Sequence, residues 1–276
     1  MSILVFGKTG QVATELRALG KVKALGRAEV DLTRPDHCAA AIENIKPSVV
    51  INAAAYTAVD KAEEDEATAQ RVNADAPGAM ARACAKTGAR LLHISTDYVF
   101  DGSGSRPWTP DDPVAPLGVY GRTKLAGEQA IRSAECAHVI LRTSWVFSAH
   151  GANFVKTMLR LGAERDKLTV VSDQIGGPTS AASIAAALLH IAQTPGPSGV
   201  YHFAGAPAVS WADFARNIFC QSDTDCAVED ILSEAYPTPA KRPHNSRLNC
   251  AALKQDYGID QPDWRADLRD VLTALA

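Results

Sequence analysis

The sequence lacks any apolar run close to the roughly 20 residues that a membrane-spanning helix needs. It starts with no basic segment followed by a cleavage site, since residues 1–2 lead straight into a short apolar run, so we expect no secretory leader. The net charge is only −3, which gives no reason to expect nucleic acid or an anionic membrane as a partner. We also find no internal repeat and no low-complexity linker.

Cysteines are few and scattered. No two of them form a CxxC pair, and no group has the spacing of zinc ligands. We therefore interpret them as reduced thiols of a cytoplasmic protein, most of them packed among alanines in helical segments. The cysteines are Cys38, Cys84, Cys136, Cys220, Cys226 and Cys250.

Short apolar runs alternate with helical patterns from residue 2 to about residue 147, and each run is short enough for a buried parallel strand. This alternation predicts an α/β fold with a doubly wound parallel sheet of the Rossmann type. Ligands bind such sheets beyond the carboxyl ends of the strands. The runs lie at residues 3–6, 22–25, 48–52, 91–94 and 137–142.

The alternation loosens from about residue 151, which indicates a small mixed C-terminal lobe that binds the substrate. We assign residues 1–150 to a dinucleotide-binding domain and residues 151–276 mainly to this lobe. Segments near residues 168–203 include a helical pattern and an apolar run that would return to the main sheet. The two parts are therefore expected to interleave, without a clean boundary.

The first apolar run leads into a glycine turn and then into a helical pattern, the order found in dinucleotide sites. Gly7 permits the tight turn, and Gly10 lets backbone approach a pyrophosphate at the helix N-terminus. Ala13 stands where close packing often requires glycine, and it is small enough to fit. We predict cofactor contacts from Gly7, Gly10, Gln11 and Val12, with a ligand-free capping turn as the alternative.

The second strand ends without the acid that would accept the ribose hydroxyls of NAD. Arg27 stands there instead, and an arginine can pair with the 2′-phosphate of NADP. We therefore expect NADPH. We leave NADH open, because Arg27 could instead be a solvated loop residue that contacts no cofactor. Asp31 and Leu32 are candidate contacts on the adenine side.

Small residues follow the third strand and would let a flat cofactor lie against backbone. Tyr56 and Thr57 continue this segment, and we include them in the cofactor site. The acidic run at residues 63–66 is interpreted as a solvated helix start without a chemical role. The small residues are Ala53, Ala54 and Ala55.

Residues 90–128 carry the most informative pattern. Tyr120 and Lys124 are four apart, so both side chains project from one face of a helix. An ammonium beside a phenol favours the phenolate and lowers the phenol pKa from about 10, which suits proton exchange with a carbonyl or alcohol oxygen. Thr96, at the end of the fourth strand, can add a second hydrogen bond to that oxygen. A surface pair is the alternative.

These motifs resemble one family over nearly the whole chain. The GxxGxxA turn, Thr96 and the YxxxK spacing are similar to the extended short-chain dehydrogenase/reductase superfamily. The more specific stretches STDYVFDG at residues 95–102 and RTSW at residues 142–145 resemble the dTDP-4-dehydrorhamnose reductases. The resemblance implies an NAD(P)H-dependent oxidoreductase of nucleotide-sugar and carbohydrate biosynthesis. It would reduce the C4 ketone of dTDP-4-dehydro-L-rhamnose to dTDP-L-rhamnose.

The resemblance also implies individual roles. Tyr120 would protonate the C4 oxygen, Lys124 would hold the nicotinamide ribose, and Thr96 would orient the ketone. Asp97 and Trp145 would contact the sugar, although core packing is the default for a tryptophan alone. Arg242 would meet the diphosphate, with an interlobe salt bridge as the alternative.

Some members of the family bind Mg²⁺ at a dimer contact through several glutamates. Glu15 matches the first of these, but the other two positions align with Ala182 and Ala274. One carboxylate cannot hold Mg²⁺ well, because the ion needs several oxygen ligands. We therefore predict no metal site and expect a monomer or a weak homodimer.

Two other readings share this scaffold. One is a nucleotide-sugar 4-epimerase or 4,6-dehydratase, but a dehydratase usually carries an Asp-Glu pair after the threonine, whereas Asp97-Tyr98 follows here. The other is a non-catalytic, NADP-binding regulatory relative, against which the intact Thr96, Tyr120 and Lys124 count.

Overall fold

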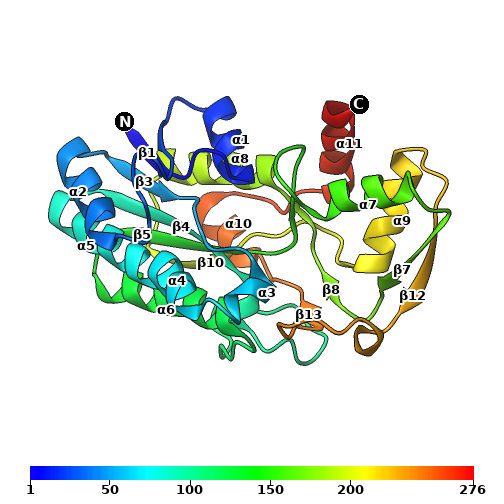
Figure 1. The fold of residues 1–276 in the computed structure, drawn as a ribbon. Coiled ribbons are helices and arrows are strands. Elements are labelled where there is room, and N and C mark those ends of the chain that lie inside the picture. Colours follow the sequence, from blue (N-terminus) through cyan, green and yellow to red (C-terminus); the bar gives the residue numbers. More distant parts are fainter.

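The computed structural model describes all residues from Met1 to Ala276. Its centre is a six-stranded sheet in which every neighbouring pair is parallel, as Figure 1 shows. The predicted doubly wound α/β class is thereby confirmed. In spatial order the strands are β10 (Gly199–His202), β5 (His138–Thr143), β4 (Arg90–Thr96), β3 (Val49–Asn52), β1 (Ile3–Phe6) and β2 (Lys23–Leu25).

Helices cover both faces of this sheet, because alternate strand residues point to opposite sides. Ile3 and Val5 of β1 belong to a core shared with one helix layer, whereas Leu4 and Phe6 belong to the core under the other. The first layer contains α1 (Gln11–Leu19), α8 (Ala181–Gln193) and α10 (Ala251–Tyr257), and the second contains α2 (Pro35–Ile45), α5 (Ala76–Thr87) and α6 (Val119–Ser133).

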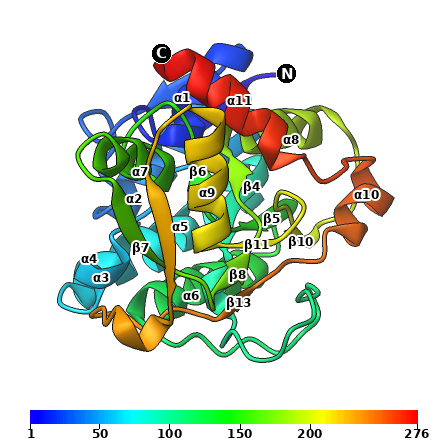
Figure 2. The same cartoon turned by 90° about the vertical axis from the view of Figure 1, so that its right-hand side faces the viewer.

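The C-terminal lobe, which faces the viewer in Figure 2, has its own hydrophobic core and three small sheets. α7 (Phe154–Gly162), α9 (Trp211–Gln221) and α11 (Trp264–Leu275) contribute to that core. Its strands pair as β7 (Lys167–Val171) with β12 (Ala227–Ile231), β8 (Ile175–Gly176) with β11 (Val209–Ser210) and β13 (Asn245–Ser246), and β6 (Val146–Phe147) with β9 (Thr179–Ser180).

The two parts of the chain interleave in space. Of the segments near residues 168–203, α8 packs against the central sheet and β10 pairs with β5 at its edge. β7 instead pairs with β12 in the C-terminal lobe. The exact division into two domains stays a prediction. No helix is long and apolar enough to cross a bilayer.

The connection between β3 and β4 is broken into several helical pieces. α3 (Val59–Ala62) and α4 (Glu66–Gln70) precede a single π-helical turn, η1 (Arg71–Asp75), which continues into α5. α5 ends at Thr87 and is capped by Gly88, whose φ of 76° is the left-handed conformation that glycine adopts easily at a helix C-terminus. Two short 3₁₀ turns, η2 (Asp97–Val99) and η3 (Ser233–Ala235), complete the list.

Candidate active site

A cavity of about 1060 Å³ opens beyond the carboxyl ends of β1, β3, β4 and β5. With the exception of Arg242, every side chain or backbone segment proposed for the site lines it. Convergence at this edge follows from the parallel strands, since their carboxyl ends all meet there. The lining includes Gly7, Gly10, Gln11, Val12, Arg27, Asp31, Leu32, Ala53, Ala54, Ala55, Tyr56, Thr57, Thr96, Asp97, Tyr120, Lys124 and Trp145.

The glycine turn after β1 has the shape that a dinucleotide requires. Gly7 has a φ of 116°, and a Cβ added there would lie 3.3 Å from the carbonyl oxygen of Ala53 and 3.3 Å from the Cβ of Ala13. Gly10 begins α1 without a side-chain cap, so the first N–H groups of the helix remain available to an anion. This end of the cavity therefore fits a pyrophosphate.

The end of the cavity beside Arg27 and Asp31, where we predicted the adenine side, carries exposed charges. Arg27 has a side chain that is 82% exposed, with its Nε 3.5 Å from Asp31 Oδ2. Lys8 Nζ donates to Glu29 at 2.6 Å, and Glu29 also accepts from the backbone N–H of Gly26. The hydrogen bonds from Thr33, together with Arg27, lower the pKa of Asp31.

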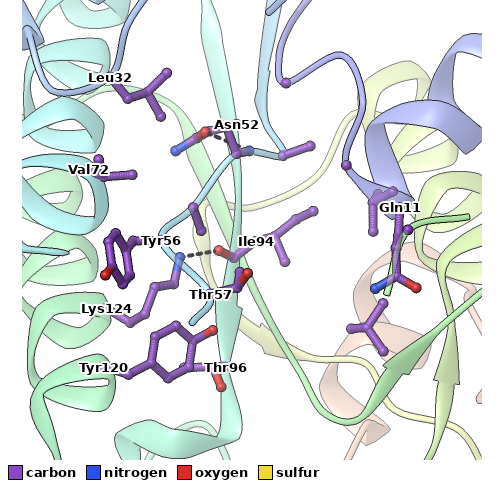
Figure 3. Close-up of a pocket in the computed structure, with 18 of the residues that line it drawn as sticks. Gln11, Leu32, Asn52, Tyr56, Thr57, Val72, Ile94, Thr96, Tyr120 and Lys124 are labelled. Carbon is purple, nitrogen blue, oxygen red and sulfur yellow. Dashed lines mark hydrogen bonds between the residues drawn. The ribbon is translucent and has the colours of Figure 1, made fainter. Parts of the chain in front are cut away.

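At the other end, Tyr120 and Lys124 project from α6 toward β4, as Figure 3 shows. Lys124 is buried, and its Nζ donates to the carbonyl oxygen of Ile94 at 2.7 Å and lies 3.1 Å from Nε2 of His93. The ring of Tyr120 lies beside Thr96, and Tyr98 packs edge-on against it with a centroid distance of 5.5 Å. The predicted group of Thr96, Tyr120 and Lys124 is thus brought together.

One electrostatic expectation is wrong. We predicted that Lys124 lowers the pKa of Tyr120, but burial raises the pKa of Tyr120 to about 12, with a hydrogen bond from Thr96 acting in the opposite direction. Burial also lowers the pKa of Lys124 to about 8, opposed by Glu128. The lysine nitrogen is turned to Ile94 and His93, so it does not offset the cost of burying the phenolate.

Two buried polar atoms in the cavity wall lack partners. They are Oδ2 of Asp97 and Oγ1 of Thr143. Burial raises the pKa of Asp97 to about 6. Because buried polar groups are normally hydrogen-bonded, these two residues are candidates for contact with a polar ligand in the cavity.

Trp145 lies between the cavity and the core of the C-terminal lobe. Its φ of 49° is unusual for a tryptophan, and its ring stacks on Trp211 with a centroid distance of 3.6 Å. Gly176 is required beside it, because an added Cβ would lie 2.6 Å from the indole. A strained residue held by packing at a cavity wall is typical of ligand sites.

Arg242 lies outside the cavity wall. Its guanidinium makes a two-point ion pair with Asp60, with distances of 3.1 Å and 2.8 Å between nitrogen and carboxylate oxygens. This is the salt bridge that the sequence left as the alternative, and contact with a diphosphate stays a prediction.

Comparison with known proteins decides the family. Residues 1–276 match the family model described as RmlD substrate binding domain. A dTDP-4-dehydrorhamnose reductase of Sinorhizobium fredii is 44% identical, with 100% of this chain and 98% of that protein covered. The chain belongs to the dTDP-4-dehydrorhamnose reductase family. The resemblance inferred from the motifs is thereby confirmed, and with it the class of oxidoreductase.

Solved structures of relatives agree over their full length. A dTDP-4-dehydrorhamnose reductase of Clostridium acetobutylicum has a TM-score of 0.93 at 37% identity and covers 100% of this chain and 99% of its own. One of Bacillus anthracis, solved in complex with NADP, has a TM-score of 0.94 at 32% identity and covers 99% of this chain and 100% of its own. That complex is consistent with the nicotinamide dinucleotide predicted for this reductase family member.

Several residues that build the site were not found from the sequence. Asn73, in the π-helical turn, accepts from the backbone N–H of Tyr56 at 2.8 Å and donates to its carbonyl oxygen and to Thr123. Nothing in the local pattern marks Asn73, because its partners lie 17 and 50 residues away.

The acidic run at residues 63–66, predicted to be a solvated helix start without a chemical role, makes structural contacts that were not predicted from the sequence. Glu63 accepts from the backbone N–H of Val119 at 2.8 Å and so caps the helix that carries the YxxxK motif. Asp65 accepts from the hydroxyl of Tyr56 and lines the cavity. A carboxylate at a helix N-terminus also interacts favourably with the helix dipole.

No group of three or more His, Cys, Asp or Glu side chains is arranged to hold a metal ion. Glu15, the one match to the family's magnesium ligands, lies 3.2 Å from Nε2 of His150. Both the lack of a metal and the oligomeric state stay predictions.

Proposed function

We propose that this reductase converts dTDP-4-dehydro-L-rhamnose to dTDP-L-rhamnose, with NADPH preferred over NADH. The supporting observation is one continuous cavity with a glycine turn suited to a pyrophosphate at one end and Tyr120 beside the buried Thr96 at the other. Hydride and proton can therefore reach the same carbonyl from different sides of a single site. The family relationship supports the substrate class.

Tyr120 supplies the proton. Its raised pKa keeps the hydroxyl protonated near neutral pH, which is the form that a donor needs in the reducing direction. The Thr96 hydroxyl, which donates to Oδ1 of Asp97 at 3.1 Å in the free enzyme, turns its single proton to the same C4 oxygen and orients the ketone. The carbonyl carbon gains a hydride and its oxygen gains the phenolic proton, so that the C=O becomes a CH–OH and Tyr120 is left as a phenolate.

The remaining side chains position the two ligands. When bound, the nicotinamide supplies the hydride. The start of α1, Gly10 to Val12, holds the pyrophosphate, and Lys124 has a donor left for a ribose hydroxyl after its bond to Ile94. Asp97 accepts a hydrogen bond from a sugar hydroxyl, and Thr143 donates one to a sugar hydroxyl, each through its unpaired oxygen. Trp145 packs against the pyranose ring.

The test is NADPH oxidation with dTDP-4-dehydro-L-rhamnose, measured for the wild type and for Tyr120→Phe. We expect the variant to lose at least ~10²-fold in kcat, which is typical for removal of a positioned acid. Tyr236→Phe is the matched control, because Tyr236 is 62% exposed and should leave the rate unchanged. A folded Tyr120→Phe enzyme with near wild-type rate would exclude Tyr120 as the donor.

The same preparation separates the alternatives. A 4-epimerase retains its dinucleotide through the cycle, so denaturing the purified protein would release NAD and no net NADPH oxidation would be seen. A regulatory relative would bind NADPH without turnover of any dTDP- or UDP-linked 4-keto sugar. Stoichiometric NADPH oxidation with the dTDP-sugar contradicts both.

A further inference from the structure

His93 is a buried imidazole between Asn52 and Lys124, under the floor of the cavity. Its Nδ1 lies 3.0 Å from Nδ2 of Asn52, and its Nε2 lies 3.1 Å from Nζ of Lys124. Both neighbours line the cavity, whereas His93 is only 1% exposed and does not. Nothing in the proposed reaction uses this side chain.

The orientation of Asn52 is set by its backbone neighbour. The backbone N–H of Ala54 donates to Oδ1 of Asn52 at 3.2 Å, and a backbone N–H can only donate, so the atom that it faces is the amide oxygen. The other amide atom, which faces His93, is therefore the NH₂ group. An amide NH₂ only donates, so Nδ1 of His93 must accept.

A neutral imidazole that accepts at Nδ1 carries its proton on Nε2. That N–H points at Nζ of Lys124, and it can form a hydrogen bond only if Nζ has a free lone pair. An ammonium has three donors and no acceptor, whereas an uncharged amine has one lone pair and two donors. One of those donors already serves the carbonyl oxygen of Ile94 at 2.7 Å. The contacts around His93 are all satisfied only by the amine.

We propose that His93 is a positioning residue that, through Asn52, favours the uncharged amine of Lys124 over the ammonium in the free enzyme. The proposal rests on the proposed function for its consequence: a lysine without charge leaves Tyr120 protonated and ready to donate. Protonating Lys124 would require the other tautomer of His93 and a turned Asn52 amide, which loses the bond to Ala54. The charge of Lys124 is thereby coupled to the hydrogen bond between Asn52 and the backbone N–H of Ala54, which lines the cavity.

The other ionisable groups around Lys124 agree with this assignment. Glu128, on the same helix, favours the ammonium, but Arg142 and Ser95 donate to its oxygens. Tyr120 is neutral, and Asp97 lies near it rather than near the lysine. Burial lowers the pKa of Lys124 to about 8 and that of His93 well below its usual range, so the imidazole is uncharged near neutral pH and the lysine amine is populated far more than on an exposed lysine.

The first test measures the tautomer directly. Two-bond proton–nitrogen correlation spectra of the free enzyme, labelled with ¹⁵N-histidine, separate an Nε2–H from an Nδ1–H imidazole, and His93→Gln identifies the signal. We expect the Nε2–H tautomer at pH 9, where Lys124 is mainly uncharged. The Nδ1–H tautomer in the wild type at pH 9 would overturn the proposal.

The second test is Asn52→Asp, which is nearly isosteric. One carboxylate oxygen can keep the bond to Ala54 while the other accepts from His93, so we expect the Nδ1–H tautomer and a charged Lys124. The ¹³Cε signal of Lys124 should titrate at least about one pH unit higher than in the wild type. Asn249→Asp is the control, because Asn249 bonds the N–H two residues on, as Asn52 does, but on the surface.

A folded Asn52→Asp protein with an unchanged tautomer and an unchanged titration would also overturn the proposal. Both measurements use the free enzyme and need neither cofactor nor turnover. A failure of the proposed reaction would leave them as expected, so the two ideas fail separately.

Discussion

The two ends of the cavity hold similar charged groups in opposite surroundings. At the proposed catalytic end, Lys124 and Asp97 are buried and Tyr120 is half-buried, and burial is the main cause of each shifted pKa. At the adenine end, Lys8 pairs with Glu29 and Arg27 with Asp31 on an open surface. Water and salt screen the second set, whereas they barely reach the first. Burial, more than the identity of the charged groups, therefore decides how strongly each group affects stability and binding.

The catalytic end also rests on a buried ion pair. Glu128 on α6 and Arg142 on β5 are 2% and 4% exposed, and they meet at 3.0 Å and 2.7 Å. Ser95 on β4 donates to the same carboxylate. The pair therefore ties the helix that carries Tyr120 to the strands on which the substrate side of the site is built.

Breaking that pair should give the largest effect. Glu128→Gln leaves the Arg142 guanidinium buried without its counter-charge, so we expect the free energy of unfolding to fall by about 3–5 kcal/mol. Urea denaturation followed by circular dichroism measures this. Glu66→Gln is the control. Glu66, on α4, lies 3.7 Å from Arg122 on the exposed side of α6, and losing this exposed pair should change stability by less than about 0.5 kcal/mol. Equal losses in both variants would contradict the comparison.

Replacing Asp97 should raise the free energy of unfolding, whereas replacing Glu128 should lower it. The pKa of Asp97 is about 6 in the folded protein against an ordinary value of 3.8, so the carboxyl ionises at lower pH in the unfolded chain and folding stability falls as pH rises through this window. Above pH ~6 the cost is about 3 kcal/mol, from roughly two pKa units at 1.36 kcal/mol each. Asp97→Asn removes this cost.

We therefore expect Asp97→Asn to be more stable than the wild type at pH 8, with the difference vanishing below about pH 4. Urea denaturation across this pH range is the measurement. Activity should fall at the same time, because the unpaired oxygen of Asp97 is the proposed sugar contact. A variant that is less stable at pH 8 and has no pH-dependent difference would show that Asp97 is not strained by burial.

What could be predicted from the sequence was what is local along the chain. The strands of the main sheet were found because each is a short apolar run, and the lining residues were found because they follow strand ends. The glycine turn was found because Gly7 and Gly10 stand between a strand and a helix. These features depend on neighbours a few residues away.

What could not be predicted depends on partners far apart in the sequence or on burial. Asn73 and His93 contact residues 17 to 50 positions away, and no spacing rule connects them. The direction of the Tyr120 pKa was missed because a four-residue spacing shows proximity to Lys124 but not how deeply the phenol lies. Arg242 was ambiguous for the same reason, since a guanidinium suits a diphosphate and Asp60 equally well.

The exposed end gives the smallest expected effect, and it completes the comparison. Arg27 is well exposed, so its attraction for the 2′-phosphate is screened, and we expect Arg27→Ala to weaken NADPH binding only about 2- to 5-fold and NADH binding not at all. The difference should vanish at about 1 M salt, where the Debye length is ~3 Å. Arg160→Ala is the control, because Arg160 forms a similar exposed pair with Glu164 away from the cavity. Fluorescence titration measures each affinity, and a loss of ~100-fold that persists in high salt would mean that this end, too, is closed to water when the cofactor binds.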